Sequence, residues 1–354
     1  MGNIFDYLLW RGDVLIDSSN SFNEIDSLIL SIFSFLPFNK IDFKEATVFE
    51  LFGKMEDLPI NDYVNSKDKE LLILLKNTNR FKDLVLSNYE RIYDKDSLNQ
   101  FCAITIHLPN NEIYISFIGT DSTIHGWNED LNMSFMETIK SQIKGKEYLE
   151  KIADIYKNKK IRIGGFSKGG NVSIYSYLMT DINIQNKVIK VDNFDGPGFS
   201  EEFVDNNEYG SLLLKIETYI PQESIIGRLL NHNEKITIIN SNEKHIYQHD
   251  IFTWNILGKN FIYKETTTKF SDDIKNTITK SLENTSIEQR KVAINAIFDI
   301  LYSLDVDTFK EISTSLSKTI PKILNKYRKL SKENRKNISN IITIFIKSYI
   351  NNSN

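Results

Sequence analysis

Residues 160–170 read KIRIGGFSKGG, and this stretch decides the fold. The short apolar run from Lys160 to Gly165 predicts a strand, and helical spacing follows from about Gly169 to Thr180. Ser167 stands between them in a G-x-S-x-G pattern. A serine on a tight turn between a strand and a helix needs very small neighbours, because the two elements approach closely there. The pattern therefore predicts a nucleophilic serine at Ser167, held between the motif glycines Gly165 and Gly169.

A glycine-rich phosphate-binding turn is the alternative for this motif. The spacing of its glycines matches neither G-x-G-x-x-G nor the P-loop pattern, so we favour the serine. The start of the following helix adds a partial positive charge and N–H groups that have no helical acceptor. We therefore expect the backbone N–H of Lys168 to donate to an oxyanion.

Strand-like and helical patterns alternate around the motif. Residues 101–108 and 112–118 flank Pro109-Asn110-Asn111 and predict a hairpin. A helical stretch covers about 134–158, and further strands are predicted at 187–194, 213–220 and 235–240. Strands separated by helices of this length predict an α/β fold with a mostly parallel central sheet flanked by helices. Functional side chains in such sheets lie just beyond the carboxyl ends of the strands.

A second candidate for oxyanion binding follows the strand at 112–118. Thr120 comes directly after Gly119. A hydroxyl residue in that place can donate both its N–H and its side-chain O–H to an oxyanion. An ordinary turn between a strand and a loop is the alternative.

The rest of the chain divides at about residue 265. Residues 1–95 predict helices and loops, and residues from about 268 onward predict helices with few strand signals. Leu28–Phe38 is the most apolar run, and it is far shorter than the roughly 20 residues that cross a bilayer. Its helical spacing predicts a packed amphipathic helix. We expect a main domain at 1–265 and a C-terminal helical extension at 266–354.

The composition is that of an ordinary globular protein. The 354 residues are 41% hydrophobic and 25% charged, which argues against wholesale disorder. Cys102 is the single cysteine, so no intramolecular disulfide can form, and the first residues lack a signal-peptide pattern. These features predict a cytoplasmic protein. The net charge of −4 argues against a nucleic-acid partner, and without ligand spacing or a cofactor motif we expect neither metal nor cofactor.

The C-terminal segment is strongly basic. Residues 318–347 contain nine Lys or Arg and one acid, Glu333. An apolar stripe at helical spacing follows, formed by Ile338, Ile341, Ile342, Phe345 and Ile346. The pattern fits a helix that packs this stripe on the domain and leaves its basic face in solvent. It also fits a basic amphipathic helix on an anionic membrane, which would make the protein peripheral to that membrane.

Two groups of motifs resemble known families. Phe117-Ile118-Gly119-Thr120, Trp127 and Asp130-Leu131 resemble the strand and lid segment of the class 3 (fungal-type) lipases. That resemblance implies an oxyanion role for Thr120 and a lid at 124–130, with Trp127 over the substrate pocket. The arginine of the family pattern is replaced here by Ile118, so its salt bridge is absent.

Residues from about 3 to 260 resemble more closely a bacterial, lipase-like branch known as Mbeg-like. The matching motifs are Asp6-Tyr7, Arg11-Gly12-Asp13, Phe22-Asn23-Glu24-Ile25-Asp26, Gly126-Trp127-Asn128-Glu129-Asp130, Phe194-Asp195-Gly196-Pro197-Gly198-Phe199 and Gln248-His249-Asp250. This resemblance implies an α/β-hydrolase fold with lipase-like chemistry, and it says little about the substrate.

The base that a serine nucleophile needs must come from five histidines. In α/β-hydrolases the chain order is Ser, then Asp or Glu, then His. This order leaves His232, His245 and His249. We favour His249, because its aromatic and apolar neighbours suit a loop packed over the site. His245 and His232 remain alternatives.

The acid must lie between Ser167 and His249 and follow a strand. Glu223 is the carboxylate nearest to the place after residues 213–220 where the lipase pattern has an Asp. A Glu can orient an imidazole equally well. Asp195, at the end of the preceding strand, is the competitor. The resemblance assigns its strand to the pocket wall, and an Asp before Gly-Pro is also a common turn residue. We favour Glu223.

These residues predict a serine hydrolase that cleaves carboxylic esters, lipid-like acyl esters by resemblance, through an acyl-serine intermediate. Its partner would be a small-molecule or lipid ester. Thioesterase, peptidase and acyltransferase activities use the same three residues. A hydrolase-fold binding module with a degenerate site is the alternative from another class, and the absent Asp favours it.

Overall fold

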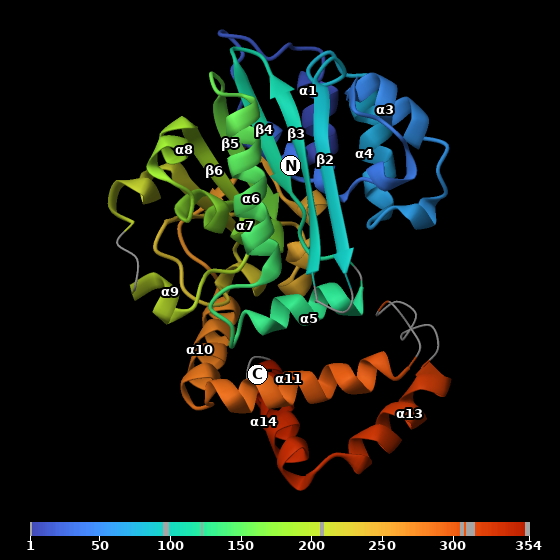
Figure 1. The fold of residues 1–354 in the computed structure, drawn as a ribbon, viewed down its shortest axis with the longest axis vertical. Coiled ribbons are helices and arrows are strands. Elements are labelled where there is room, and N and C mark those ends of the chain that lie inside the picture. Colours follow the sequence, from blue (N-terminus) through green and yellow to red (C-terminus); the bar gives the residue numbers. More distant parts are fainter. Residues whose placement is uncertain are drawn as a thin grey trace.

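The computed structural model describes residues 2–94, 99–121, 123–205, 209–304, 308 and 316–350. Within these ranges, the side chains of 316–318, 341–342 and 344–350 are left undescribed. Figure 1 shows a central sheet with helices on both faces and a helical extension beyond one end of the sheet.

The strands in the described part of the chain form a nine-stranded sheet in the order β1-β2-β3-β4-β5-β6-β7-β8-β11. Strands β4 to β8 pair in parallel, and the pairs at both edges are antiparallel. The strands are β1 (Glu45–Thr47), β2 (Val85–Asp94), β3 (Asn99–Leu108), β4 (Glu112–Phe117), β5 (Lys160–Phe166), β6 (Val188–Phe194), β7 (Ile216–Pro221), β8 (Lys235–Ile239) and β11 (Tyr263–Lys264).

The predicted hairpin joins β3 to β4. Asn110 and Asn111 both have a φ of 62°, a left-handed conformation that asparagine tolerates better than most residues. Leu108 consequently pairs with Glu112 across the turn. From β4 to β8 each strand pairs in parallel with the one before it, as the alternation of strand and helix patterns predicts.

Helices cover both faces of this sheet because its strands are apolar on both sides. On one face, α6 (Lys140–Ile155) and α7 (Lys168–Leu178) pack against β3, β4, β5 and β6. Side chains such as Ile113 and Ile163 point into the core on that face. Tyr114 points to the opposite face, which the N-terminal helices cover. These are α1 (Ile4–Arg11), α2 (Glu24–Ser31), α3 (Val48–Met55) and α4 (Ser66–Lys76).

The chain thus has an α/β-hydrolase fold, with a parallel centre and a serine turn between β5 and α7. Short helices α8 (Ile182–Lys187) and α9 (Glu201–Asp205) follow α7 and β6, and α5 (Ile124–Asn132) follows β4. Strands β9 (Ile256–Leu257) and β10 (Asn260–Phe261) form a separate hairpin.

Several sequence expectations need correction. Region 1–95 contains β1 and β2, which the sequence did not predict. Strand β2 escapes recognition because a bulge between Ser87 and Glu90, with Asn88 at a φ of 52°, breaks its alternation. The strand expected at 213–220 begins at Ile216, since residues 210–215 are 3-10 turns.

The boundaries of two predicted helices also differ. The helix expected at 134–158 spans Lys140–Ile155. In the apolar run at 28–38, α2 ends at Ser31 and 3-10 turns follow, yet its apolar residues are buried as predicted.

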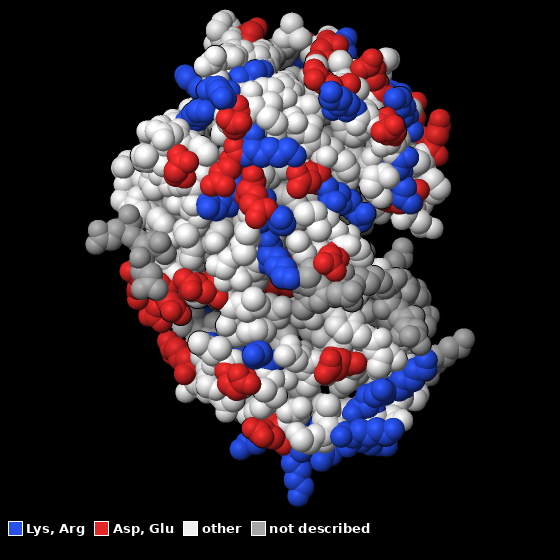
Figure 2. Space-filling model, in the orientation of Figure 1, with Lys and Arg blue, Asp and Glu red and all other residues white. Residues whose placement is uncertain are grey.

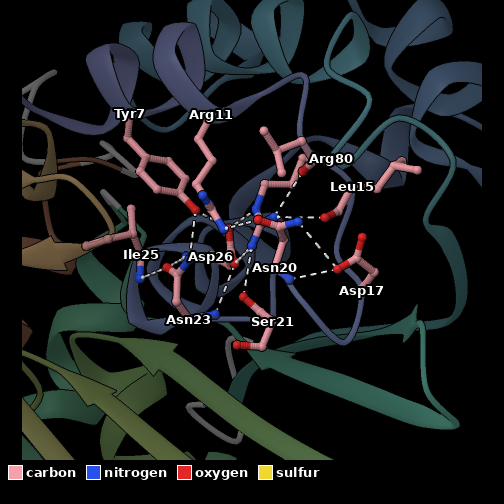
Figure 3. Close-up of polar contacts among 11 residues, drawn as sticks. Tyr7, Arg11, Leu15, Asp17, Asn20, Ser21, Asn23, Ile25, Asp26 and Arg80 are labelled. Carbon is pink, nitrogen blue, oxygen red and sulfur yellow. Dashed lines mark hydrogen bonds and ion pairs between the residues drawn. The ribbon is translucent and has the colours of Figure 1, made fainter.

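A buried ion pair joins the N-terminal helices. Arg80, after α4, pairs with Asp26 of α2, and neither side chain is exposed (Figure 3). Arg80 Nε donates to the Asp26 carboxylate at 2.7 Å, and the guanidinium also donates to the carbonyl oxygens of Val14 and Ser21. The Tyr7 hydroxyl of α1 donates to the same carboxylate at 2.7 Å. Because each buried charge is paired and hydrogen-bonded, this cluster holds α1, α2 and the segment after α4 together.

The C-terminal extension is helical, as predicted, and consists of α10 (Lys269–Glu283), α11 (Ile287–Tyr302), α13 (Leu316–Lys329) and α14 (Lys332–Ile350). Ala293 and Ala296 of α11 pack against Ile338 of α14. The other residues of the predicted apolar stripe, Ile341, Ile342, Phe345 and Ile346, lie outside the described side chains. Among the helices that are described, none combines the length and the apolar character needed to cross a membrane.

Replacing Arg80 by Met should lower the free energy of unfolding by about 3–5 kcal/mol, because Asp26 would be left buried without its cation. Urea denaturation of the purified protein measures this change. Lys144→Met is the matched control, since Lys144 pairs with Glu147 at the exposed surface and should contribute less than about 1 kcal/mol. Equal midpoints for the two variants would contradict a structural role for the buried pair.

Candidate active site

Ser167 lies on the turn where β5 ends and α7 begins. Its φ is 57°, a left-handed value that is rare for a residue with a side chain. A Cβ atom on Gly165 would overlap the backbone of Gly169, and one on Gly169 would overlap the Phe117 carbonyl oxygen. The glycines of the motif are therefore required by the close approach of strand and helix. The Ser167 N–H donates to the Phe194 carbonyl oxygen at 2.9 Å, which holds the strained turn against β6.

A chain of hydrogen bonds leads from Ser167 through His249 to Asp195. Ser167 Oγ lies 3.0 Å from His249 Nε2, and His249 Nδ1 lies 2.6 Å from Asp195 Oδ2. With the proton on Nδ1, the imidazole donates to Asp195 and accepts the Ser167 hydroxyl proton. The Phe166 ring packs on the imidazole with 4.6 Å between ring centroids. This is the geometry of a nucleophile, a base and an acid that orients the base.

Asp195 is buried at the end of β6, and its second carboxylate oxygen is also occupied. Asp195 Oδ1 accepts hydrogen bonds from the Ser224 hydroxyl and from the Gly227 N–H. A Cβ on Gly227 would overlap Oδ1, so a glycine is needed there. The loop after β7 thus supplies donors to Asp195. Hydrogen bonds to both oxygens fix the orientation of the carboxylate toward the imidazole.

Glu223, the acid favoured from the sequence, lies elsewhere. Glu223 Oε2 accepts the His245 N–H at 2.7 Å, and the Glu223 N–H donates to Gln248 Oε1 at 2.8 Å. These contacts fasten the 3-10 turn η6 (His245–His249), which carries His249. We expected Glu223 to contact His249, but the carboxylate that contacts His249 in the structure is that of Asp195. The sequence pattern misleads because the carboxylate that contacts His249 follows β6, one strand earlier than the lipase pattern places it.

The alternative histidines have other surroundings. His245 has a half-exposed side chain and packs its ring on Phe270. The His232 side chain is 5% exposed, and its Nδ1 lies 2.6 Å from Glu234 Oε1. Neither contact involves Ser167, so the structure brings His249 rather than these two to the serine.

The two predicted oxyanion donors flank Ser167. A Cβ on Gly119 would lie about 3.1 Å from Ser167 Cβ, so the residue before Thr120 touches the serine. The Thr120 hydroxyl donates to the Asp130 carboxylate of α5. Lys168 is the first residue of α7, where a backbone N–H has no acceptor within the helix. The backbone N–H groups of Thr120 and Lys168 thus belong to two segments that adjoin Ser167.

The side chain of Lys168 forms an ion pair that sequence reasoning missed. Lys168 Nζ lies 2.8 Å from Glu129 Oε2 and 3.6 Å from Asp130 Oδ1, and the Lys168 and Glu129 side chains are 1% and 2% exposed. Burial opposes the lysine charge, but the two carboxylates outweigh it and raise the pKa of Lys168. Burial raises the pKa of Asp130 to about 6, against the opposing effect of Lys168. In the sequence, the partners of Lys168 are visible only as an acidic pair, Glu129 and Asp130. Such a pair is also typical of a helix face exposed to solvent.

A family model described as Mbeg1-like matches residues 75–299, more than half of the chain. The chain belongs to the Mbeg1-like family. Ser167, Asp195 and His249 all lie within the matched part of this Mbeg1-like protein. The family resemblance that its motifs indicated is thereby confirmed. No curated protein sequence matches the chain.

The Mbeg1-like chain is also similar to solved lipase structures. A fungal lipase in an inhibitor complex is 12% identical over 60% of this chain and 77% of its own, with a TM-score of 0.35. The Lip2 lipase of Yarrowia lipolytica is 14% identical over 44% of this chain and 66% of its own, with a TM-score of 0.29. A lipase of Rhizopus microsporus var. chinensis is 11% identical over 53% of this chain and 69% of its own, with a TM-score of 0.33. The lipase-like hydrolase fold of the Mbeg1-like chain rests on its own sheet order and serine turn.

Helix α5 occupies the segment in which the lipase resemblance implies a lid. In the Mbeg1-like structure this helix is held on two sides. Glu129 pairs with Lys168 of α7, and the Asn128 amide donates to the Tyr302 hydroxyl of α11 at 2.8 Å. Ile124 is buried against Ile294 and Phe298 of α11. Trp127, expected over the pocket, lies on this helix and is 40% exposed. Displacing α5 would break a buried ion pair, which opposes free lid movement.

A cavity of about 290 Å³ lies beside the turn that carries Thr120. Ile118 and Asp121, on either side of that turn, line the cavity together with Phe35. A Cβ on Gly119 would contact both the Phe35 ring and Ser167, so a single residue separates this wall from the serine. The remaining lining mixes aromatic and polar side chains, including Tyr89, Tyr93, Asn39, Asn61 and Arg91. Neither Ser167 nor His249 lines this cavity.

Replacing Lys168 by Met in the Mbeg1-like protein should cost about 3–5 kcal/mol in the free energy of unfolding, because Glu129 would remain buried without a cation. Thermal and urea denaturation measure the loss. Lys146→Met on α6 is the matched control, since its ion pair with Glu150 is more than one-third exposed. A Lys168 variant as stable as this control would mean that the buried pair does not hold α5.

Proposed function

We propose that this protein is a serine hydrolase of carboxylic esters, with Ser167 as nucleophile, His249 as general base and Asp195 as the acid that orients it. One observation carries the proposal: Ser167 Oγ, both nitrogens of His249 and Asp195 Oδ2 form a continuous chain at distances of 3.0 and 2.6 Å. Ser167 is moreover held on a strained turn at the start of a helix. Strain at such a position, maintained by required glycines, supports a functional role for the serine.

The mechanism follows from these positions. His249 Nε2 takes the hydroxyl proton as Ser167 Oγ attacks the ester carbonyl carbon, and a tetrahedral oxyanion forms. The backbone N–H groups of Thr120 and Lys168 stabilise its negative charge. The protonated imidazole then donates its proton to the leaving alcohol, and an acyl-Ser167 remains. Water, activated by the same imidazole, attacks the acyl carbon and releases the carboxylic acid with the free serine.

A hydrogen bond between Thr120 and Asp130 supports the proposed oxyanion site. Because the Thr120 hydroxyl donates to Asp130, the turn that presents the Thr120 N–H is tied to α5. Asp130 is in turn close to Lys168, whose backbone supplies the second donor. The same buried network thus supports both sides of the proposed oxyanion site, so that the donors are oriented before substrate binds.

The substrate class is proposed from resemblance and from the cavity. The lipase-like motifs favour acyl esters, and the cavity beside Thr120 has apolar and polar lining for a small amphipathic ester. A thioesterase or an acyltransferase would use the same residues. The contact between Asp195 and His249 speaks against a degenerate binding module, since a carboxylate partner for the base is present although Glu223 is not in that position.

Ser167→Ala should abolish hydrolysis of short p-nitrophenyl esters and covalent labelling by a fluorophosphonate probe. The proposed mechanism loses its nucleophile, whereas the fold should persist because Ala fits the space of Ser. Gel fluorescence reports the labelling, absorbance reports the hydrolysis and circular dichroism checks the fold. Wild-type turnover in this variant would refute the assignment of Ser167. A wild-type protein that neither labels nor hydrolyses would favour the binding module.

The acid can be identified by a matched pair of variants. Asp195→Asn should reduce kcat by about 10⁴-fold, because an amide in place of the carboxylate favours the wrong imidazole tautomer. Glu223→Gln should stay within about tenfold of wild type, since Gln retains an oxygen for the His245 N–H. Steady-state ester hydrolysis measures both. The reverse ranking would assign the acid to Glu223.

A further inference from the structure

The charge of this protein is strongly segregated along the chain. Residues 318–347 carry nine basic residues and one acid, a net charge of +8. Because the whole chain has a net charge of −4, the remaining residues carry −12. A segregation of this size suggests that the segment meets an anionic partner, since scattered charges would suffice for solubility.

The basic side chains of α13 and α14 form an exposed surface, here called the basic face. It consists of Lys322, Lys326, Arg328, Lys329, Lys332 and Lys336. Figure 2 shows Lys and Arg gathered at the end of the molecule where Figure 1 places α13. No ion pair joins any of these six to a carboxylate within the described part of the chain. The basic face is therefore available to an external anion.

Two exposed apolar side chains lie on the side of α13 opposite to its lysines. Ile320 and Leu324 of α13 are each 47% exposed, and their spacing of four residues puts them on one side of the helix. Proteins that bind single-stranded nucleic acid use exposed aromatic side chains to stack on the bases. In the described part of α13 and α14, the large exposed apolar residues include no aromatic one. A cationic surface with no exposed aromatic side chain among these residues matches the headgroups of an anionic bilayer better than it matches a nucleic acid.

The extension is anchored next to the proposed catalytic residues. Its helix α11 packs on α5 through Ile124. Ser271 of α10 donates its hydroxyl to the Ser224 carbonyl oxygen at 2.7 Å, in the loop that binds Asp195. In Figure 1 the extension lies beyond the end of the sheet at which β4 leads into α5. Ser167 lies at the same end, because β5 runs parallel to β4.

We infer that the basic face docks on the surface of an anionic phospholipid bilayer. The attraction is electrostatic, between the basic face and the anionic headgroups. Docking would turn the end of the molecule that carries Ser167 toward the lipid, with α5 and α11 between them. This binding does not require the proposed hydrolase activity.

Co-sedimentation of the full chain with vesicles tests the inference. We expect binding to phosphatidylcholine vesicles containing about 30% phosphatidylserine, loss of that binding at about 1 M salt, and little binding to phosphatidylcholine alone. The triple variant Lys322→Gln, Lys326→Gln, Lys329→Gln should bind on the order of a hundredfold more weakly, since each basic residue contributes about fivefold near an anionic surface.

A matched triple variant controls for charge alone. Lys144→Gln, Lys146→Gln, Lys151→Gln removes three exposed charges from α6, and it should bind within about twofold of wild type. Ser167→Ala should bind as wild type does, so a failed hydrolase assignment would leave the vesicle result intact. Equal binding to neutral and anionic vesicles, no binding to either, or equal losses in both triple variants would overturn the inference. Tighter binding to a single-stranded oligonucleotide than to vesicles of equal phosphate concentration would overturn it as well.

Discussion

The close approach of β5 to α7 at Ser167 is the constraint on which the rest of the structure depends. It demands glycines at Gly165 and Gly169, because a Cβ at either position would overlap backbone. It also holds Ser167 at a positive φ, which no local preference favours. The strain is sustained by neighbours on both sides: the Phe194 carbonyl accepts the Ser167 N–H, and Gly119 contacts the serine from the turn after β4. The serine is therefore positioned by three adjacent parallel strands.

The other site residues come from loops that these strands bring to one edge. Asp195 ends β6, and the loop after β7 donates two hydrogen bonds to it. Glu223 in that same loop binds the turn that carries His249, so one short segment supports both Asp195 and His249. On the opposite side of Ser167, the buried Lys168–Glu129 pair ties α5 to the start of α7. The C-terminal extension then covers α5 and contacts the loop at Ser224, which links a basic surface to the edge of the sheet that holds the site.

Much of this arrangement could be predicted where it depends on residues close in the sequence. The hairpin of β3 and β4 follows from two asparagines in a tight turn, and the serine turn follows from glycines within five residues. Strand β2 was missed because a bulge disrupts its pattern, and only pairing with β3 makes it a strand. His249 could be selected because few histidines follow Ser167. Carboxylates follow two successive strands, and the sequence favoured Glu223, whereas the structure brings Asp195 to His249.

The sequence by itself determined the fold class, the serine turn, the helical extension and its basic charge, since each depends on local periodicity, small residues or composition. Only the tertiary structure decided which carboxylate meets His249, and that Lys168 pairs with Glu129 rather than facing solvent. The physical reason is that both contacts join residues 39 or more positions apart. Their distances depend on how β6, α5 and α7 pack, and no short motif encodes that packing.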